Sequence, residues 1–506
     1  MRTSECGDAA SKRPPSRSPL VAQASRSLDS LATDEPWLAA LDAFRTRCPR
    51  RLERIADYER IIAGGDHLRM GAAVLAGLHR PAPPVEGWLN KADGRKKRVF
   101  SYPAPDELLF RTVNRLLQPA AAEAASPWCR SFLPGGGART SFRSLLGDVD
   151  LATKAAVRLD VRDYFNSIDV DDLLARLPPA LAAEPVGQLL EAALCDPRVV
   201  SAGAVVDGGR KGVMAGTPLA PLLATLYLRE LDEEVAGAGA TYARYSDDII
   251  ALGPPAQVAE LDRLIRSRLE ERGLEVNERK SSVTSPGQPW DFLGFRYGAG
   301  TVALAPLTER KLRGRSTRLA RRLLRWRERS GASPERAASA FLRRINRRLY
   351  GVPGERSDFS WATWFLPMLD GPQGLVALDA HIQREARYAA TGRRNPRTRR
   401  QVPYDALVAA GHVPLVSAFW AARESHAAYE DLVSRRAGLG QPAVNWRATA
   451  WARSERVESS IPSVSSTTSA PGPDRNTSAR PSVRLACEAP SIPSTAARPP
   501  GGSQPW

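Results

Sequence analysis

The sequence has 506 residues, 43% of them hydrophobic, which suffices for two or three domains with substantial cores. Lysine and arginine number 72 against 55 aspartate and glutamate, so the formal net charge is +17. This surplus favours a polyanionic partner, because each phosphate that a basic side chain neutralises releases condensed counterions. The alternative is an arginine-rich composition without functional meaning.

Five cysteines are scattered along the chain without a Cys-x-x-Cys pair or a histidine cluster. This distribution argues against a zinc site and against a disulfide framework. No apolar run approaches membrane-spanning length, and the first residues lack the apolar core of a signal peptide. We therefore expect a cytoplasmic protein without a membrane partner.

Residues 1–35 are rich in Ser, Arg, Pro and Ala without a steady period, which predicts a disordered segment. Residues 36–85 are expected to form a helical region, because Leu38, Leu41 and Phe44 recur at helical spacing before a turn near residues 81–84.

Residues 86–305 mix short apolar strands with helices, which predicts an α+β fold. Residues 157–161 form a short apolar run that ends at a carboxylate, and residues 242–252 indicate a hairpin with two acids at its turn. Residues 219–235 and 258–272 are expected to be helices, the second of them amphipathic.

Residues 306–450 are expected to form a basic helical extension. Ten basic residues and one acid lie between positions 310 and 329, and Ser333 followed by Pro334 is typical of a helix start. A basic loop follows at residues 393–400. Residues 451–506 contain Ser, Pro, Thr and Ala with few large apolar residues, which predicts a disordered tail.

Three acids stand out in this arrangement. Asp160 closes a predicted strand, and Asp247 and Asp248 lie side by side at the predicted hairpin turn. Such elements can bring three carboxylates together, and their mutual repulsion then calls for a divalent cation such as Mg²⁺. The alternative is that the acid pair is an ordinary turn dipeptide and Asp160 an ordinary strand end.

Five motifs in order favour the metal hypothesis. Residues 244–250 resemble the [YF]xDD signature of reverse transcriptases, and residues 159–169 resemble the first palm motif of that family. Residues 211–221 resemble its loop-helix element for template and incoming nucleotide, while residues 273–280 and 292–295 are similar to its two closing motifs.

This resemblance covers roughly residues 90 to 300 and is closest to the bacterial group II intron and retron branch. It implies a right-hand polymerase fold, with fingers and an antiparallel palm sheet at 86–305 and a helical thumb after 306. It also implies RNA-directed DNA polymerase activity, a nucleotidyltransferase reaction that adds dNTPs to a primer 3′-hydroxyl.

By the same resemblance, Asp160, Asp247 and Asp248 would hold two Mg²⁺ ions, with the Val161 carbonyl as a further ligand and Mn²⁺ as an alternative ion. Lys280 would lie near the triphosphate, as the acid that protonates pyrophosphate or as an ordinary solvated lysine.

Three further positions would bind the nucleotide. Phe165 would lie under the sugar and collide with a ribose 2′-hydroxyl, unless its ring is ordinary core. Gly216 would let the backbone approach the nascent base pair. Arg98 would hold the triphosphate, although any member of residues 95–98 could take this role.

Other segments point to nucleic acid by resemblance. Residues 134–139 resemble a fingers turn that contacts template, and residues 292–295 form either the turn that steadies the primer or an apolar strand with a glycine bulge. The basic helices after residue 306 would hold a duplex by its backbone, or present a solvated arginine face.

Ala215 departs from the family pattern, since most relatives have Gln before the motif glycine. An Ala-Gly-Thr-Pro version resembles the defence-associated bacterial reverse transcriptases, of the abortive-infection and "unknown group" types. With no HNH endonuclease pattern in the C-terminal part, an antiphage role is favoured over intron mobility.

Three functional hypotheses follow. The first is a polymerase with an RNA template, a DNA primer and product, and dNTPs. In one form of this hypothesis the template is a dedicated non-coding RNA. The second is template-independent addition of deoxynucleotides, and the third is a non-catalytic RNA-binding or maturase-like scaffold. The sequence assigns no oligomeric state.

Overall fold

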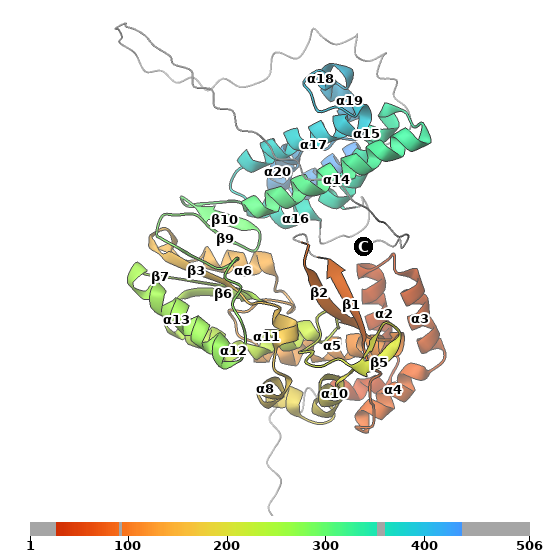
Figure 1. Cartoon of the computed structure of the whole chain (residues 1–506), viewed down its shortest axis with the longest axis vertical. Coiled ribbons are helices and arrows are strands. Elements are labelled where there is room, and N and C mark those ends of the chain that lie inside the picture. Colours follow the sequence, from red (N-terminus) through yellow and green to blue (C-terminus); the bar gives the residue numbers. More distant parts are fainter. Residues whose placement is uncertain (1–26, 91–93, 352–359, 438–506) are drawn as a thin grey trace, which may run out of the picture. The chain divides into compact units, whose positions relative to one another are not determined.

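The computed structural model describes residues 27–90, 94–351 and 360–437 (Figure 1). The first described residues correct the expectation of disorder up to residue 35, because residues 27–32 are helical and Leu28 and Leu31 are fully buried. Two segments, residues 1–35 and 451–506, were predicted to be disordered. Residues 1–26 of the first segment and the whole of the second lie outside the described residues.

Four N-terminal helical elements precede the first strand: η1 (Ser30–Ala32), α2 (Glu35–Arg47), α3 (Leu52–Ala63) and α4 (Asp66–Leu75). The apolar face of α2 contains Trp37, Leu41 and Phe44, all buried. Leu38 is 44% exposed, so its place in the predicted stripe was wrong. The spacing i, i+4, i+7 lies on one side of a helix, and Trp37 fits it where Leu38 does not.

The first sheet has the strand order β2-β1-β4-β5 and joins segments about a hundred residues apart. Its strands are β1 (Val85–Asn90), β2 (Lys96–Ser101), β4 (Arg198–Ser201) and β5 (Ala204–Asp207). Strands β1 and β2 form an antiparallel hairpin, and Val85 pairs with Val200 in a parallel contact. Side chains alternate between the two faces of β2, so Lys97 and Arg98 point in opposite directions.

The second sheet is antiparallel throughout and has the order β6-β7-β3-β8. Its strands are β3 (Ala155–Asp160), β6 (Thr241–Tyr245), β7 (Asp248–Gly253) and β8 (Ser282–Thr284). The predicted strand at 157–161 and the predicted hairpin at 242–252 are therefore confirmed. The strands β3 and β7 are almost continuously apolar and buried, which fixes their register.

The helical elements between residues 104 and 271 are α5 (Ala104–Ala124), α6 (Ala138–Leu145), η2 (Leu151–Thr153), α7 (Tyr164–Ser167), α8 (Val170–Ala175), α9 (Pro179–Ala182), α10 (Val186–Leu194), α11 (Ala220–Tyr227), α12 (Arg229–Gly237) and α13 (Pro255–Glu271). Of these, α6, α12 and α13 pack against the second sheet. The helix predicted at 219–235 is thus two helices, divided at Leu228, whose φ of −101° and ψ of 21° depart from helical values. The amphipathic helix predicted at 258–272 is confirmed as α13.

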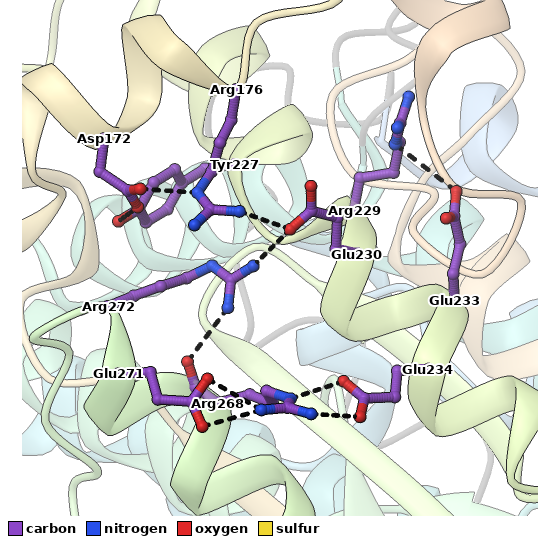
Figure 2. A network of polar contacts seen from close by, with 10 residues as sticks. All are labelled: Asp172, Arg176, Tyr227, Arg229, Glu230, Glu233, Glu234, Arg268, Glu271 and Arg272. Atoms are coloured by element: carbon purple, nitrogen blue, oxygen red, sulfur yellow. Dashed lines mark hydrogen bonds and ion pairs between the residues drawn. The ribbon is translucent and has the colours of Figure 1, made fainter.

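Ten side chains form a polar network over α8, α12 and α13 (Figure 2). Glu230 accepts from both Arg176 and Arg272, at 2.6 and 2.8 Å, and Arg268 bridges Glu234 and Glu271. Most of these groups are partly exposed, so each pair contributes only about 0.2–1 kcal/mol. The network therefore links these helices through several individually weak contacts.

A small sheet of three strands follows, β9 (Trp290–Phe292), β10 (Phe295–Gly298) and β11 (Thr301–Leu304). Leu293 and Gly294 join β9 to β10 with φ values of 50° and 90°, as in a two-residue hairpin turn. Of the two interpretations of residues 292–295, the turn is the one that the backbone adopts.

The C-terminal region is helical, as predicted. Its elements are α14 (Pro306–Ser330), α15 (Pro334–Tyr350), α16 (Trp361–Phe365), η3 (Leu366–Met368), α17 (Gln373–Thr391), α18 (Thr398–Gln401), α19 (Tyr404–Ala409), α20 (Leu415–Glu424) and α21 (His426–Ala437). Ser333 caps α15 by accepting from the Arg336 N–H, which confirms the predicted helix start. One hydrophobic core joins this region to the second sheet, since Ile250, Phe295 and Phe341 belong to the same cluster.

Within the described residues, no helix combines the length and the apolar character that crossing a membrane requires.

Candidate active site

The β6–β7 turn and the end of β3 bring the three predicted acids together. Asp160 lies directly opposite Asp248 in the β3–β7 register, and the Val161 N–H donates to the Asp247 carbonyl at 2.9 Å. The turn needs a left-handed residue, and Ser246 takes that conformation with a φ of 60°. The site therefore depends on strand pairing that the apolar core imposes.

The negative charges of these three carboxylates repel one another. Burial raises the pKa of Asp248 to about 7, and the charges of Asp247 and Asp160 act in the same direction. Burial and Asp160 also raise the pKa of Asp247, while Lys280 and Lys97 act against this shift. A further positive charge close to these acids would favour their ionised forms.

Lys280 and Asn277 both donate hydrogen bonds to the carboxylate of Asp160. Lys280 Nζ donates to Oδ2 at 2.6 Å, and Asn277 Nδ2 donates to Oδ1 at 2.8 Å. Burial lowers the pKa of Lys280, but the hydrogen bond to Asp160 and the three negative charges outweigh it, so the pKa is raised. Lys280 is thus charged and lies at the acids, while its place near a triphosphate stays a prediction.

Asn277 is a site residue that the sequence reasoning missed. Its N–H also donates to the Asp160 carbonyl at 2.7 Å, so Asn277 holds both the backbone and the side chain of that residue. The available signal was its position within residues 273–280, three residues before Lys280 in a motif already recognised.

The donor set is one that suits a hard cation. All the groups are oxygen ligands, which Mg²⁺ and Mn²⁺ prefer, and a bound cation would oppose the burial and the mutual repulsion that raise the pKa values of Asp247 and Asp248. Within the described part of the chain, no three His, Cys, Asp or Glu side chains already stand in ligating geometry. One reason is that Lys280 and Asn277 hold Asp160, so ion binding would require Lys280 to leave that carboxylate.

Arg98 does not reach the acids. Its Nε donates to Glu86 at 2.6 Å, and its terminal nitrogens donate to the carbonyls of Gly208 and Arg210. These bonds tie β2 to β1 and to the segment after β5, so Arg98 is engaged within the chain, and its contact with a triphosphate stays a prediction. Lys97 points the other way, with Nζ 5.5 Å from the centre of the Phe165 ring.

Phe165 is half-buried beside this lysine. Its ring meets those of Tyr164 and Phe132 edge-on, at 5.8 and 6.3 Å between centroids. The side chain packs against the core but remains partly open, and its place under the nucleotide sugar stays a prediction.

Gly216 allows a close approach of two backbones. Its φ is 105°, and a Cβ there would lie 2.8 Å from the Phe100 carbonyl oxygen of β2. The preceding Ala215 accepts from the Phe100 N–H at 2.8 Å and donates to the Asn166 side chain at 3.0 Å. This junction fixes the loop of residues 211–217 against the fingers strand.

A cavity of about 580 Å³ borders the same loop and the acidic turn. Its walls include Gly216 and Tyr245, and the turn predicted at residues 134–139 contributes three glycine and proline positions. Helices α2 and α5 add the guanidinium groups of Arg47, Arg111 and Arg115. An extended anionic strand would find both a basic wall and an open backbone here.

The buried ion pair of Arg244 and Asp232 supports the acidic turn from below. Both side chains are fully buried, and Arg244 donates to the two Asp232 oxygens at 2.7 Å each. Its remaining donors bind the carbonyls of Ser246 and Thr225. A single guanidinium therefore ties α12, α11 and the turn that carries Asp247.

We predict that Asp232→Ala destabilises the protein by about 3–5 kcal/mol, because it leaves the Arg244 charge buried without a partner. Chemical denaturation measures this loss. Glu233→Ala on the same helix is the matched control, since its pair with Arg229 is exposed and long at 3.5 Å. A loss no larger than that of the control would contradict the role assigned to the pair.

We predict that Gly216→Ala costs about 1–3 kcal/mol of stability, because alanine is strained at this φ and collides with Phe100. Thermal unfolding would show the loss, together with lower nucleotide incorporation. Gly237→Ala, at the end of α12, meets nothing within 4 Å of its new Cβ and should be neutral. Equal melting temperatures for the two variants would contradict this account.

One comparison with known proteins, the match to a family model, covers this site. Residues 90–297 match the family model described as "Reverse transcriptase (RNA-dependent DNA polymerase)". A solved structure of apo telomerase from Candida tropicalis, truncated from its C-terminal domain, is similar at 10% identity and a TM-score of 0.35. That likeness covers 48% of this chain and 60% of the telomerase chain, which is less than two thirds of its length. No curated protein matches the sequence.

The family match includes every element that brings Asp160, Asp247 and Asp248 together, and the α+β architecture around them is the expected one. Residues 90–297 therefore form a reverse transcriptase domain, the domain of RNA-directed DNA polymerases, which are nucleotidyltransferases.

Proposed function

We propose that the whole protein is an RNA-directed DNA polymerase that extends a primer 3′-hydroxyl with dNTPs. The observation that carries this proposal is the juxtaposition of Asp160 with Asp248 across β3 and β7, with Asp247 at the adjoining turn. In the proposed enzyme, these acids and the Val161 carbonyl would hold two Mg²⁺ ions, or Mn²⁺ in their place. Residues 86–305 act as fingers and palm, and residues 306–450 act as thumb.

When bound, the ions would supply Lewis-acid activation of the 3′-hydroxyl and stabilise the charge of the leaving pyrophosphate. The chain's own groups do the rest. Lys280 is released from Asp160, turns to the triphosphate and donates a proton to the leaving pyrophosphate oxygen. Its raised pKa keeps it protonated until that step.

Lys97 replaces Arg98 in our assignment of the triphosphate contact. It lies on the face of β2 that is turned to Phe165, and its charge acts on Asp247. Phe165 then supports the sugar from beneath, where a ring disfavours a ribose 2′-hydroxyl. The cavity beside Gly216 holds the template strand against the arginines of α2 and α5.

One observation favours template-independent addition as a second candidate. Ala215 is 3% exposed and presents a buried methyl group next to Gly216, with no side-chain amide to seat the nucleotide. This is also the feature on which we base an antiphage role. A dedicated non-coding RNA as partner and a cytoplasmic location belong to the same proposal.

Primer extension tests the proposal. Purified protein with Mg²⁺ and labelled dNTPs should yield product on a primed RNA template and none without template. Product in the absence of any template would support the second candidate. If wild type and Asp247→Ala are equally inactive with and without template, both polymerase functions are wrong and an RNA-binding scaffold is left.

A metal titration without substrates tests the ion site. We expect Mg²⁺ to raise the melting temperature of the wild type, by about 1 °C for each kcal/mol of binding free energy. Asp248→Asn should melt higher than the wild type in EDTA, because one of three repelling carboxylates is gone, and should gain little from Mg²⁺.

Glu275→Gln is the control for that titration. Its carboxylate lies in the neighbouring motif but is 71% exposed and paired with Arg162. The control should respond to Mg²⁺ as the wild type does. An equal Mg²⁺ response in Asp248→Asn would refute the assignment of the ions to these acids.

A further inference from the structure

A second basic cavity lies in the helical C-terminal region, outside the reverse transcriptase domain. It has a volume of about 490 Å³ and is formed by α17 and by the loop that leads to α18 (Figure 1). The basic loop noted at residues 393–400 supplies one wall of it. Its polar lining consists of four arginines and two amides: Arg384, Arg387, Arg394, Arg399, Gln383 and Asn395.

The acid beside this cavity is already engaged. Glu385 is buried, and Arg394 binds both of its oxygens, at 3.0 and 2.9 Å. Arg384 donates to the His381 ring, which is a neutral partner when unprotonated. Among the residues that the structure describes, neither Arg387 nor Arg399 has a carboxylate partner. Glu385 therefore compensates the charge of Arg394, whereas no carboxylate of the described residues compensates Arg387 or Arg399.

Burial and a neighbouring positive charge both disfavour the charged form of Arg387. The residue is 7% exposed, and its Nε donates to the Val402 carbonyl at 2.8 Å. Burial lowers the pKa of Arg387, and the charge of Arg399 lowers it further. An arginine-rich solvated face would keep its guanidinium groups apart in water and would not bury one of them beside another.

A phosphate group fits this chemistry. The guanidinium fork donates two parallel hydrogen bonds to phosphate oxygens, and an anion removes the repulsion between arginines. A phosphate monoester at a strand end carries more charge than a phosphodiester and can enter a concave site. A backbone phosphate of a duplex is held on an open surface, as the outer face of α14 would hold it.

We propose that the cavity of Arg384, Arg387, Arg394 and Arg399 binds the terminal phosphate of a nucleic-acid strand. This site is separate from the three acids and does not take part in nucleotide addition. It gives the C-terminal region a specific task, the capture of a strand end, in addition to the sequence-independent holding of a duplex.

Fluorescence anisotropy with the full chain tests this proposal. Single-stranded oligonucleotides of one sequence, as RNA and as DNA, are compared with a 5′-phosphate, a 3′-phosphate or hydroxyls at both ends. EDTA removes divalent ions, so the binding does not depend on polymerase activity and survives a failed primer-extension assay. We expect about tenfold tighter binding of a strand with a terminal phosphate.

Arg399→Gln and Arg400→Gln form a matched pair, because both residues are exposed neighbours in α18 and only Arg399 lines the cavity. The phosphate preference should vanish in Arg399→Gln and persist in Arg400→Gln, while both variants melt as the wild type does. Equal affinity for phosphorylated and hydroxyl ends would overturn the proposal. Inorganic phosphate that competes at the same concentration as a phosphorylated strand would also overturn it.

Discussion

The buried pair of Arg244 and Asp232 is the contact on which the position of the acidic turn depends. Two charges without access to water are tolerated only when every donor and acceptor is satisfied, and Arg244 meets this demand with Asp232 and with two backbone carbonyls. One of those carbonyls belongs to Ser246, directly before Asp247. The hydrogen bonds that the buried Arg244 needs therefore also hold the turn that carries Asp247 in place.

A second junction, at Asn166, holds β2 to the loop of residues 211–217. Asn166 donates to the Arg98 carbonyl of β2 and accepts from the Ala215 N–H, so one amide joins three segments. The strand β2 then continues the contact through Phe100, against which only a glycine at position 216 fits. Lys97 and Phe165 face each other because both neighbouring segments are fixed at this point.

Local pattern was enough to predict the hairpin, the strand before it and the α+β class, because alternation and turn residues are properties of neighbours in sequence. Local pattern did not decide which face of an element a residue takes. It put Leu38 on the buried face of α2, where Trp37 lies instead, and it did not separate Arg98 from Lys97, which point to opposite sides of β2. Asn277 was missed because its contact with a residue 117 positions away exists only in the fold.

The same limit applies to the positive charge. Composition alone could not separate a functional arginine from a solvated one, yet the fold places arginines in three different environments. Arg268 bridges exposed acids (Figure 2), and Arg244 is buried with its partner, so neither charge is available to a ligand. Arg387 and Arg399 share a cavity and repel each other. Net charge predicts a polyanionic partner only through groups of this third kind, because their charge is balanced by nothing in the described chain.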